Sequence, residues 1–500
     1  MLYKSTRGGV GGLTSAEAIV KGLSEDGGLY VPDSFPQLSH EEIKELAAMP
    51  YEVRASSILA KYLNDFSVQE LQMYARKAYG EKNFGVNGTV PIFMLDNNTH
   101  FLELTHGPTC AFKDIALQIL PYLLTAALEK TNEKRTACIL VATSGDTGKA
   151  SLEGFCDVPG TKIMVFYPRD GVSDIQKLQM TSQSGGNVNV VAVEGNFDDA
   201  QTGVKAVFSD EAFRAELNEH GYFLSSANSI NWGRLVPQIA YYVSAYCELL
   251  TNWTIKCGEK VNFCVPTGNF GNILAGYYAE RMGLPINKLI CASNRNDVLA
   301  DFLTEGVYDK NRQFYTTVSP SMDILVSSNL ERLLFELSGK DGGAVSEFMS
   351  SLSRTGRYEV PVEMRGELER VFAAGRCSEE DTCTTIAQVW SDHHYLIDTH
   401  TAVAYKALRD YKAESSDETT SVVVSTASPY KFCDSVLQAL GEEASAAGVE
   451  LISILQEFTG SPAPAPLATL CNAKPRFTDS VSVTGMKNAV SAFLGVGISS

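Results

Sequence analysis

The chain has 500 residues, more than one hydrophobic core usually supports, so we expect two or three domains. Its composition, 44% hydrophobic and 20% charged, is that of a globular protein. The net charge of −18 argues against nucleic-acid or anionic-membrane partners, and no apolar run reaches the ~18 residues of a membrane span. The 11 cysteines are scattered and no apolar signal core is evident, so we expect reduced thiols in a cytoplasmic protein. The 7 histidines lack zinc-ligand spacing, and we expect no metal site.

Residues 1–95 are predicted to form a helix-rich domain, with helices near 15–24, 40–48, 51–64 and 67–79. From about residue 96, apolar β-branched runs alternate with helical patterns. The strand candidates are 137–143, 162–167, 188–193, 261–265, 289–292 and 421–425. Helices are expected near 115–131, 148–156, 174–184, 199–219, 234–250 and 271–282. Continuous apolar strands between helices indicate an α/β fold with a mostly parallel sheet covered on both faces.

Two later segments depart from this alternation. Residues 327–390 have amphipathic spacing and are predicted to be a helical insertion in an α/β core formed by 96–326 and 391–455. Residues 461–466 alternate proline with small residues, which is typical of an extended connector. We therefore expect residues 456–500 to form a connector followed by a short helix at 484–494.

Residues 106–114 contain the most informative motif. Lys113 follows a Gly-Pro turn and enters an apolar helix. An apolar setting disfavours the ammonium form of lysine and frees the amine to attack a carbonyl. This is the chemistry of a lysine that forms a Schiff base with pyridoxal phosphate (PLP). Considered alone, a lysine near a helix start is most often solvated. The other motifs of the chain are therefore needed to distinguish a Schiff-base lysine from a solvated one.

Four loops follow predicted strands, where ligands bind in open α/β sheets. Residues 143–149 begin a helix, and the free N–H groups at its start suit an anion. This segment lacks the first glycine of a nucleotide P-loop. The alternative is an ordinary capped helix without a ligand. Residues 265–272 suit one phosphate or a simple tight turn. Thr426 suits one ligand hydrogen bond or a structural role. Residues 225–234 offer Asn228, Asn231 and Arg234 as ligand contacts or form a capped loop.

Together these pieces closely resemble the threonine synthases of the longer bacterial and fungal type. The resemblance runs in order from the N-terminus to about residue 433, so it covers nearly the whole chain. The matching stretches are residues 5–8, the Lys113 segment, 143–148, 226–234, 266–272, 400–403 and 426–429. The resemblance implies a fold-type II PLP enzyme, similar to the tryptophan synthase β-subunit, with two parallel-sheet lobes and a distinctive N-terminal domain.

The resemblance also implies roles for individual residues. Lys113 would be catalytic and would carry PLP as a Schiff base. A second anion site would bind the substrate phosphate, with Lys149 and Arg234 as the preferred pair. The remaining candidates are Gly268, Asn269, Phe270 and Asn272 at the cofactor phosphate, Thr426 at the pyridine nitrogen, Asp146 near the 3′-oxygen, and Ser144, Asn231, Thr6 and Arg7 at the substrate phosphate.

The implied reaction converts O-phospho-L-homoserine and water to L-threonine and phosphate, the last step of threonine biosynthesis. It is a lyase reaction of γ-elimination and β-replacement, in which Lys113 would act as base and acid at adjacent carbons. The sequence departs from the family at Ser428, where a histidine is usual, and at Thr399, where a proline is frequent.

Two alternative functions are weighed. A threonine-synthase-like phospho-lyase would give a keto acid, ammonia and phosphate. A non-catalytic regulatory relative is disfavoured because Lys113 is retained. The sequence leaves open whether the protein is a monomer or a homodimer.

Overall fold

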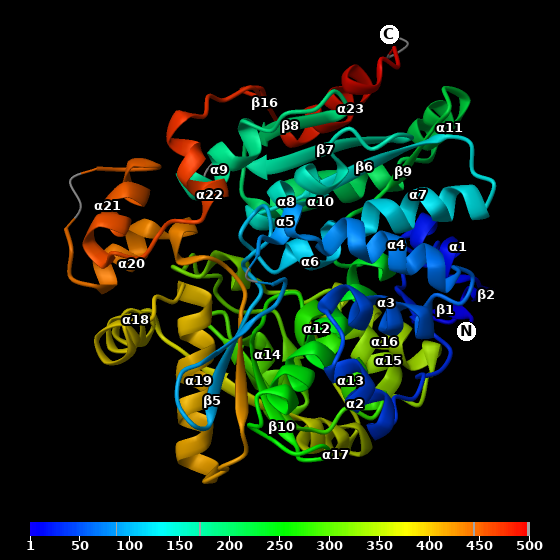
Figure 1. Cartoon of the computed structure of the whole chain (residues 1–500). Coiled ribbons are helices and arrows are strands. Elements are labelled where there is room, and N and C mark those ends of the chain that lie inside the picture. The colour runs from blue at the N-terminus through cyan, green and yellow to red at the C-terminus, as the bar shows by residue number, and fades with distance from the viewer. Residues whose placement is uncertain (87, 170–171, 444–445, 498–500) are drawn as a thin grey trace.

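The computed structural model describes residues 1–86, 88–169, 172–443 and 446–497. Two lobes, each built on a mainly parallel sheet, lie one above the other in Figure 1, and the N-terminal helices pack along one side of them. The fold class predicted from the sequence is therefore confirmed.

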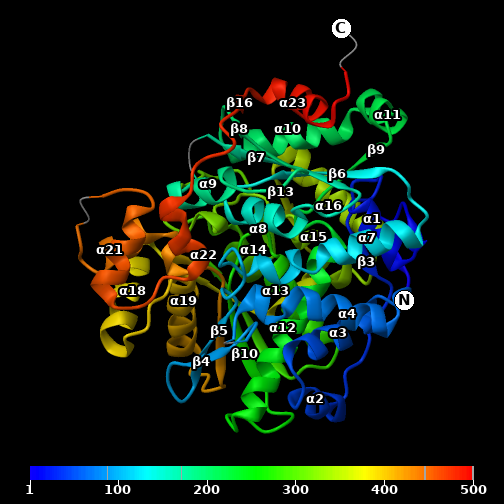
Figure 2. The same cartoon turned by 45° about the horizontal axis from the view of Figure 1, so that its top comes forward.

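The upper lobe contains a five-stranded parallel sheet in the order β16-β8-β7-β6-β9. Its strands are β6 (Thr136–Ala142), β7 (Thr161–Pro168), β8 (Val188–Val193), β9 (Tyr222–Ser225) and β16 (Ser480–Val481). Alternate side chains of β6 enter opposite cores: Leu140 faces a cluster with α10 (Phe197–Ser209) and α23 (Met486–Leu494), whereas Val141 joins the large central core. Figure 2 shows α23 beside α10 on the outer face. The other helices of this lobe are α8 (Asp146–Phe155), α9 (Asp174–Thr181) and α11 (Glu211–Glu219).

The lower lobe contains a six-stranded sheet in the order β14-β11-β10-β15-β5-β4, parallel except for β4. Its strands are β4 (Ile92–Met94), β5 (Thr99–Glu103), β10 (Val261–Pro266), β11 (Ile286–Ser293), β14 (Phe372–Arg376) and β15 (Ser421–Ser425). Phe263 of β10 faces the central core, and the next residue, Cys264, faces the cluster that contains α19 (Thr399–Ser415). The covering helices are α12 (Trp232–Thr251), α13 (Gly271–Arg281), α14 (Val298–Glu305), α17 (Val362–Val371) and α18 (Glu379–His393).

The N-terminal region has the four expected helices. Three of them begin with a reciprocal capping box, formed by Thr14 and Glu17, Ser39 and Glu42, and Ser67 and Glu70. The elements are β1 (Tyr3–Ser5), β2 (Gly11–Leu13), α1 (Ser15–Lys21), β3 (Tyr30–Pro32), α2 (His40–Ala47), α3 (Tyr51–Tyr62), α4 (Val68–Tyr79) and α5 (Glu81–Phe84).

Three predicted boundaries differ from the structure. The helix expected at 115–131 is two helices, α6 (Lys113–Leu117) and α7 (Leu120–Lys130), and Pro121, which has no N–H to donate, lies in the first turn of α7. The helix expected at 199–219 is divided at Asp210, whose side chain caps α11. Residues 327–390 are not purely helical, because β14 extends the large sheet beside β11. The same segment contains α15 (Leu330–Leu337), α16 (Gly342–Thr355) and β13 (Arg357–Glu359), which pairs with β12 (Val307–Asp309).

The C-terminal part follows β15. It contains a 3₁₀ turn, η2 (Pro429–Lys431), then α20 (Cys433–Ala439), α21 (Glu450–Thr459) and α22 (Ala465–Ala468). The expected C-terminal helix is confirmed as α23. Across the part of the chain that the structure describes, no helix combines the length and apolarity needed to cross a bilayer.

Candidate functional site

A pocket lies where the two lobes meet, at the carboxyl ends of β10 and β15. Lys113 and Thr147 reach it from the α6 and α8 side, and His400 reaches it from the start of α19. The rest of the lining includes Arg234, residues 266–272, Ser321, Met322 and Thr426. This position matches the ligand site of open α/β sheets.

Lys113 is held at the pocket by the backbone on either side of it. The Phe112 N–H donates to the Thr426 carbonyl at 2.9 Å, which ties the start of α6 to the end of β15. The Lys113 side chain is 11% exposed, and its Nζ lies 3.4 Å from the Asp146 carboxylate. Burial lowers the pKa of Lys113, Asp146 raises it, and the cations Lys431 and Arg234 lower it further. The amine therefore loses its proton more readily than a solvated lysine.

Asp146 is a buried carboxylate in the first turn of α8. Its Oδ1 lies 2.7 Å from the Lys431 Nζ and accepts a hydrogen bond from the Gln176 Nε2 at 2.8 Å. Burial alone would raise the pKa of Asp146, but Lys431 and Lys113 hold it well below its usual range. Asp146 is therefore held in its ionised form by its two lysine neighbours.

The loop between β10 and α13 forms a tight cradle. Phe270 adopts a left-handed backbone with φ of 63° directly before the first helical residue, so the turn into α13 is abrupt. A Cβ at Gly268 would lie 2.6 Å from the Ser321 carbonyl oxygen, so only glycine fits there. The Gly268 carbonyl accepts from the Ser327 hydroxyl at 2.8 Å, and the Asn269 carbonyl accepts from the Asn329 N–H at 3.1 Å. The free N–H groups at the start of α13 consequently face the pocket in a fixed geometry.

Two buried donors beside this cradle have no hydrogen-bond partner among the described residues: Asn272 Nδ2 and Arg234 Nε. The hydroxyls of Tyr241 and Tyr242 donate to Asn272 Oδ1 at 2.7 and 2.8 Å, and this fixes the orientation of the amide. Burial lowers the pKa of Arg234 to about 10, although Tyr241 opposes the shift. Unpaired buried donors are costly, so these groups fit an anionic ligand such as a phosphate.

The structure directs the other candidates for the substrate phosphate elsewhere. The Lys149 Nζ contacts Glu153 at 2.8 Å and Gln183 at 2.5 Å. The Asn231 Oδ1 accepts from the Gly233 N–H at 2.9 Å and so caps α12. Ser144 is half-buried and does not line the pocket. Of the preferred pair, Arg234 faces the pocket and Lys149 does not.

The N-terminal candidates, Thr6 and Arg7, serve as an anchor. The Arg7 guanidinium makes two hydrogen bonds of 3.0 Å to the Glu331 carboxylate of α15. The Thr6 hydroxyl donates to the same carboxylate at 2.6 Å. These contacts attach the N-terminal segment to α15, so neither side chain is available to a ligand.

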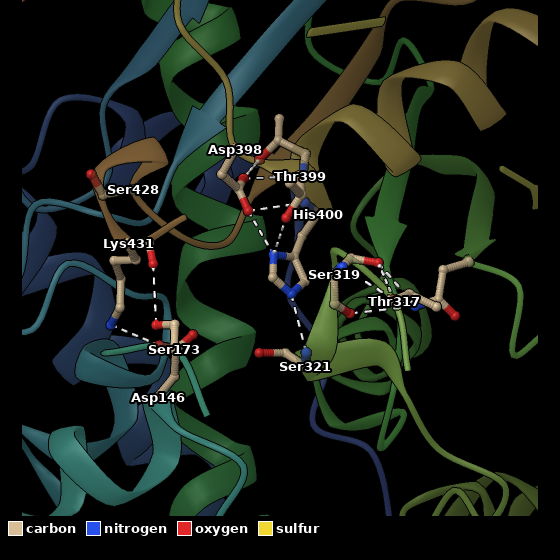
Figure 3. A network of polar contacts seen from close by, with 12 residues as sticks. Asp146, Ser173, Thr317, Ser319, Ser321, Asp398, Thr399, His400, Ser428 and Lys431 are labelled. Carbon is tan, nitrogen blue, oxygen red and sulfur yellow. Dashed lines mark hydrogen bonds and ion pairs between the residues drawn. The ribbon is translucent and has the colours of Figure 1, made fainter. Parts of the chain in front are cut away.

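His400 lines the pocket but was not assigned a role from the sequence. Its Nδ1 lies 2.7 Å from the Asp398 carboxylate, and its Nε2 accepts from the Ser321 N–H at 3.2 Å (Figure 3). These two partners orient the ring and set which ring nitrogen donates and which accepts. His400 therefore holds residue 321 over the Gly268 cradle. The only sequence feature that could have indicated this role is Asp398, the N-cap of α19, two residues before His400.

The two departures from the family pattern have local explanations. Ser428 is buried outside the pocket lining; its hydroxyl accepts from the Tyr430 N–H at 3.3 Å and caps η2. Thr399 is the first residue of α19, after the N-cap Asp398. Proline is favoured at that position because its missing N–H has no helical partner there, so threonine replaces it without loss of a helical hydrogen bond.

Three family models match the chain. They are "Threonine synthase N terminus" over residues 2–79, "Pyridoxal-phosphate dependent enzyme" over 96–427, and "Threonine synthase, C-terminal" over 401–490.

Individual relatives agree with these matches. A threonine synthase from Pseudomonas aeruginosa is 40% identical over 440 residues, which cover 88% of this chain and 90% of that protein. Human threonine synthase-like 1 is 42% identical over 436 residues, or 85% of this chain, and the match spans only 58% of that longer relative. The crystal structure of PLP-bound threonine synthase from Brucella melitensis is similar over 99% of each chain, with a TM-score of 0.87 and 38% identity.

Proposed function

Because the chain belongs to the threonine synthase family of PLP-dependent enzymes, we propose that it converts O-phospho-L-homoserine and water to L-threonine and phosphate. One observation carries the proposal: the Lys113 amine, only 11% exposed at its side chain, shares a pocket with two buried donors that lack partners, Arg234 Nε and Asn272 Nδ2. An amine beside donors suited to phosphate is what a phosphorylated amino acid and a phosphorylated cofactor both require.

The residues present fit PLP. The N–H groups that begin α13, with Asn269 and Asn272, would hold its phosphate, and Lys113 would hold its aldehyde carbon. Thr426 would face the pyridine nitrogen with a neutral hydroxyl. When bound, PLP supplies an electron sink that acidifies the C–H bond beside the amino group of an amino acid.

The proposed proton transfers use Lys113. Its amine takes a proton first from Cα and then from Cβ of the substrate, and a proton returns to Cγ after the phosphate leaves with the electron pair of the Cγ–O bond. Water supplies the hydroxyl that bonds to Cβ, its remaining proton goes to the departing phosphate, and a proton returns to Cα. One amine can serve both carbons because they are neighbours and because burial keeps its pKa low. Arg234 would stabilise the negative charge that develops on the departing phosphate.

The test is a product analysis. The purified protein, supplied with PLP, is incubated with O-phospho-L-homoserine, and phosphate, threonine, keto acid and ammonia are measured together. Equal amounts of phosphate and threonine, absent in Lys113→Ala, are the expected result. Phosphate with keto acid and ammonia would replace the proposal with the phospho-lyase.

The proposal extends to assembly and location. We infer a cytoplasmic protein that acts as a monomer or homodimer on a small molecule and binds no nucleic acid. The net charge of −18 and the free cysteines, most of them buried, support this. Light scattering after size-exclusion chromatography would distinguish monomer from homodimer, and a larger assembly would contradict the proposal.

A further inference from the structure

We infer that Lys431 is a positioning residue, which neutralises Asp146 independently of Lys113 and so frees the Lys113 amine to give up its proton. The inference rests on Lys113 being the reactive amine of the proposed function. It assigns a role to the lysine of η2, which lies outside the pocket lining and behind Asp146.

The two lysines share the Asp146 carboxylate unequally. The Lys431 Nζ lies 2.7 Å from Oδ1, whereas the Lys113 Nζ lies 3.4 Å from Oδ2. Lys431 is fully buried, and its Nζ also donates to the Thr109 carbonyl at 2.8 Å. Figure 3 shows its side chain directed at Asp146. Lys431 therefore makes the fixed contact with Asp146, because its Nζ is also held by the Thr109 carbonyl. The longer contact of Lys113 is the one that can be released.

Lys431 reaches Asp146 across the two lobes. The Ser428 N–H donates to the Cys110 carbonyl at 3.0 Å, and the Lys431 N–H donates to the Ser428 carbonyl at 3.0 Å, so η2 is fastened to the loop before Lys113. The Lys431 carbonyl also accepts from the Ser173 hydroxyl at 3.4 Å (Figure 3). The turn that follows β15 of the lower lobe thus places a cation on the first residue of α8 in the upper lobe.

The contact between Lys431 and Asp146 affects whether Lys113 can lose its proton. A buried carboxylate needs a cation, and without Lys431 the amine of Lys113 would be the cation in contact with Asp146. Loss of the Lys113 proton would then leave Asp146 uncompensated, so Lys113 would stay protonated. With Lys431 in place, Asp146 stays neutralised when Lys113 is deprotonated, and the positive charge of Lys431 itself lowers the pKa of Lys113.

Other titratable groups surround the two lysines. Within the described residues, the groups in contact with the Asp146 carboxylate are Lys113, Lys431 and Gln176. The remaining neighbours are Arg234 on α12, Asp114 on α6, Cys110 before it, Lys149 on α8 and His400 on α19. Arg234 acts on Lys113 in the same direction as Lys431 but does not contact Asp146, so it cannot replace Lys431 there.

The test measures attachment of PLP rather than turnover. Protein stripped of cofactor is mixed with PLP, and the rate at which the visible absorption band of the Lys113-bound cofactor appears is recorded against pH. Lys431→Met should shift the midpoint of this profile to higher pH by about one to two units, whereas Lys431→Arg should stay near the original. Lys406→Met is the matched control, because it removes one cation from a pair with Asp410 on α19 and should leave the midpoint unchanged.

A second variant covers the case in which Lys431→Met does not fold. Asp146→Asn combined with Lys431→Met removes both charges, so the midpoint should return to or below that of the unmodified protein. The inference would be overturned if Lys431→Met had the same pH midpoint as the unmodified protein. It would also be overturned if the double variant had a midpoint higher than that of the unmodified protein.

The result is independent of the substrate. A shifted profile together with no threonine from O-phospho-L-homoserine would refute the proposed function and leave the role of Lys431 standing. Failure of the unmodified protein to attach PLP would refute both.

Discussion

Gly268→Ala is expected to weaken PLP binding only by disturbing the cradle that would hold the cofactor phosphate. The added Cβ would lie 2.6 Å from the Ser321 carbonyl oxygen and 3.3 Å from the Met322 Cα, whereas ordinary contacts begin at 3.4 Å. The cradle or residue 321 must therefore move by about 0.8 Å, the difference between 3.4 and 2.6 Å. Neither moves freely, because the Ser321 N–H is bonded to His400 and the Gly268 carbonyl to Ser327.

The magnitude follows from the cost of overpacking. Inserting a methyl group into a tight site costs about 1–3 kcal/mol. If that cost falls on the ligand-bound geometry, the dissociation constant of PLP rises about 5- to 150-fold, at about 1.4 kcal/mol per factor of ten. The assay is a fluorescence or absorbance titration of cofactor-free protein with PLP and, separately, with pyridoxal. Pyridoxal lacks the phosphate, so its affinity should be the same in both proteins.

Gly366→Ala supplies the matched control. Gly366 is exposed within α17, and a Cβ there would meet nothing within 4 Å. This alanine should raise the free energy of unfolding by about 0.5–1 kcal/mol and leave PLP affinity unchanged. The reasoning is refuted if Gly268→Ala binds PLP as tightly as the original protein, or if it weakens pyridoxal as much as PLP.

Three further outcomes are expected. Arg234→Met should abolish the rise in melting temperature produced by inorganic phosphate without lowering that of the ligand-free protein, because it removes a buried cation that no described carboxylate contacts; an unchanged phosphate effect in thermal-shift assays would contradict this. Burial raises the pKa of Asp114 to about 6, above its unfolded value, so its contribution to stability is present at low pH and is lost as pH rises from about 4 to 6. The unfolding free energy should therefore fall by about 2 kcal/mol relative to Asp114→Asn over that interval, measured by urea denaturation, and parallel curves would refute it. His400→Ala should accelerate amide hydrogen exchange at Ser321 about fivefold for ~1 kcal/mol of lost hydrogen bond, and equal exchange would show that another contact holds residue 321.

Most of the two sheets could be predicted because buried parallel strands are continuous apolar runs. β6, β7, β8, β10, β11 and β15 all have this character. β14 could not be recognised, since Phe-Ala-Ala-Gly-Arg has little intrinsic strand preference and becomes a strand by pairing with β11. β5 and β9 were missed as well, because each is short and mixes polar with apolar residues.

The candidate site divides in a similar way. Lys113 and the 266–272 loop could be proposed as site residues from the sequence because each motif is local and carries its own turn geometry. Arg234 and Lys149 were equivalent in the sequence, and only their partners separate them: Lys149 meets Gln183 from another helix end, whereas Arg234 keeps an unpaired Nε in the pocket. The role of Lys431 depends on a contact between residues far apart in the chain, which no local pattern encodes.

The distribution of charge explains how such a chain can bind phosphate. With a net charge of −18 it repels anions at long range, so electrostatic steering cannot account for recognition. Near the pocket the local pattern differs: Lys431 is paired with Asp146, whereas the buried Arg234 has an unpartnered Nε and contacts no carboxylate among the described residues. A buried cation without a carboxylate is unfavourable and is relieved by an anionic ligand. Because the interaction is short-range and desolvated, phosphate affinity depends on the fixed donors of Arg234 and α13, and it is weakly screened by salt compared with binding at an exposed cationic surface.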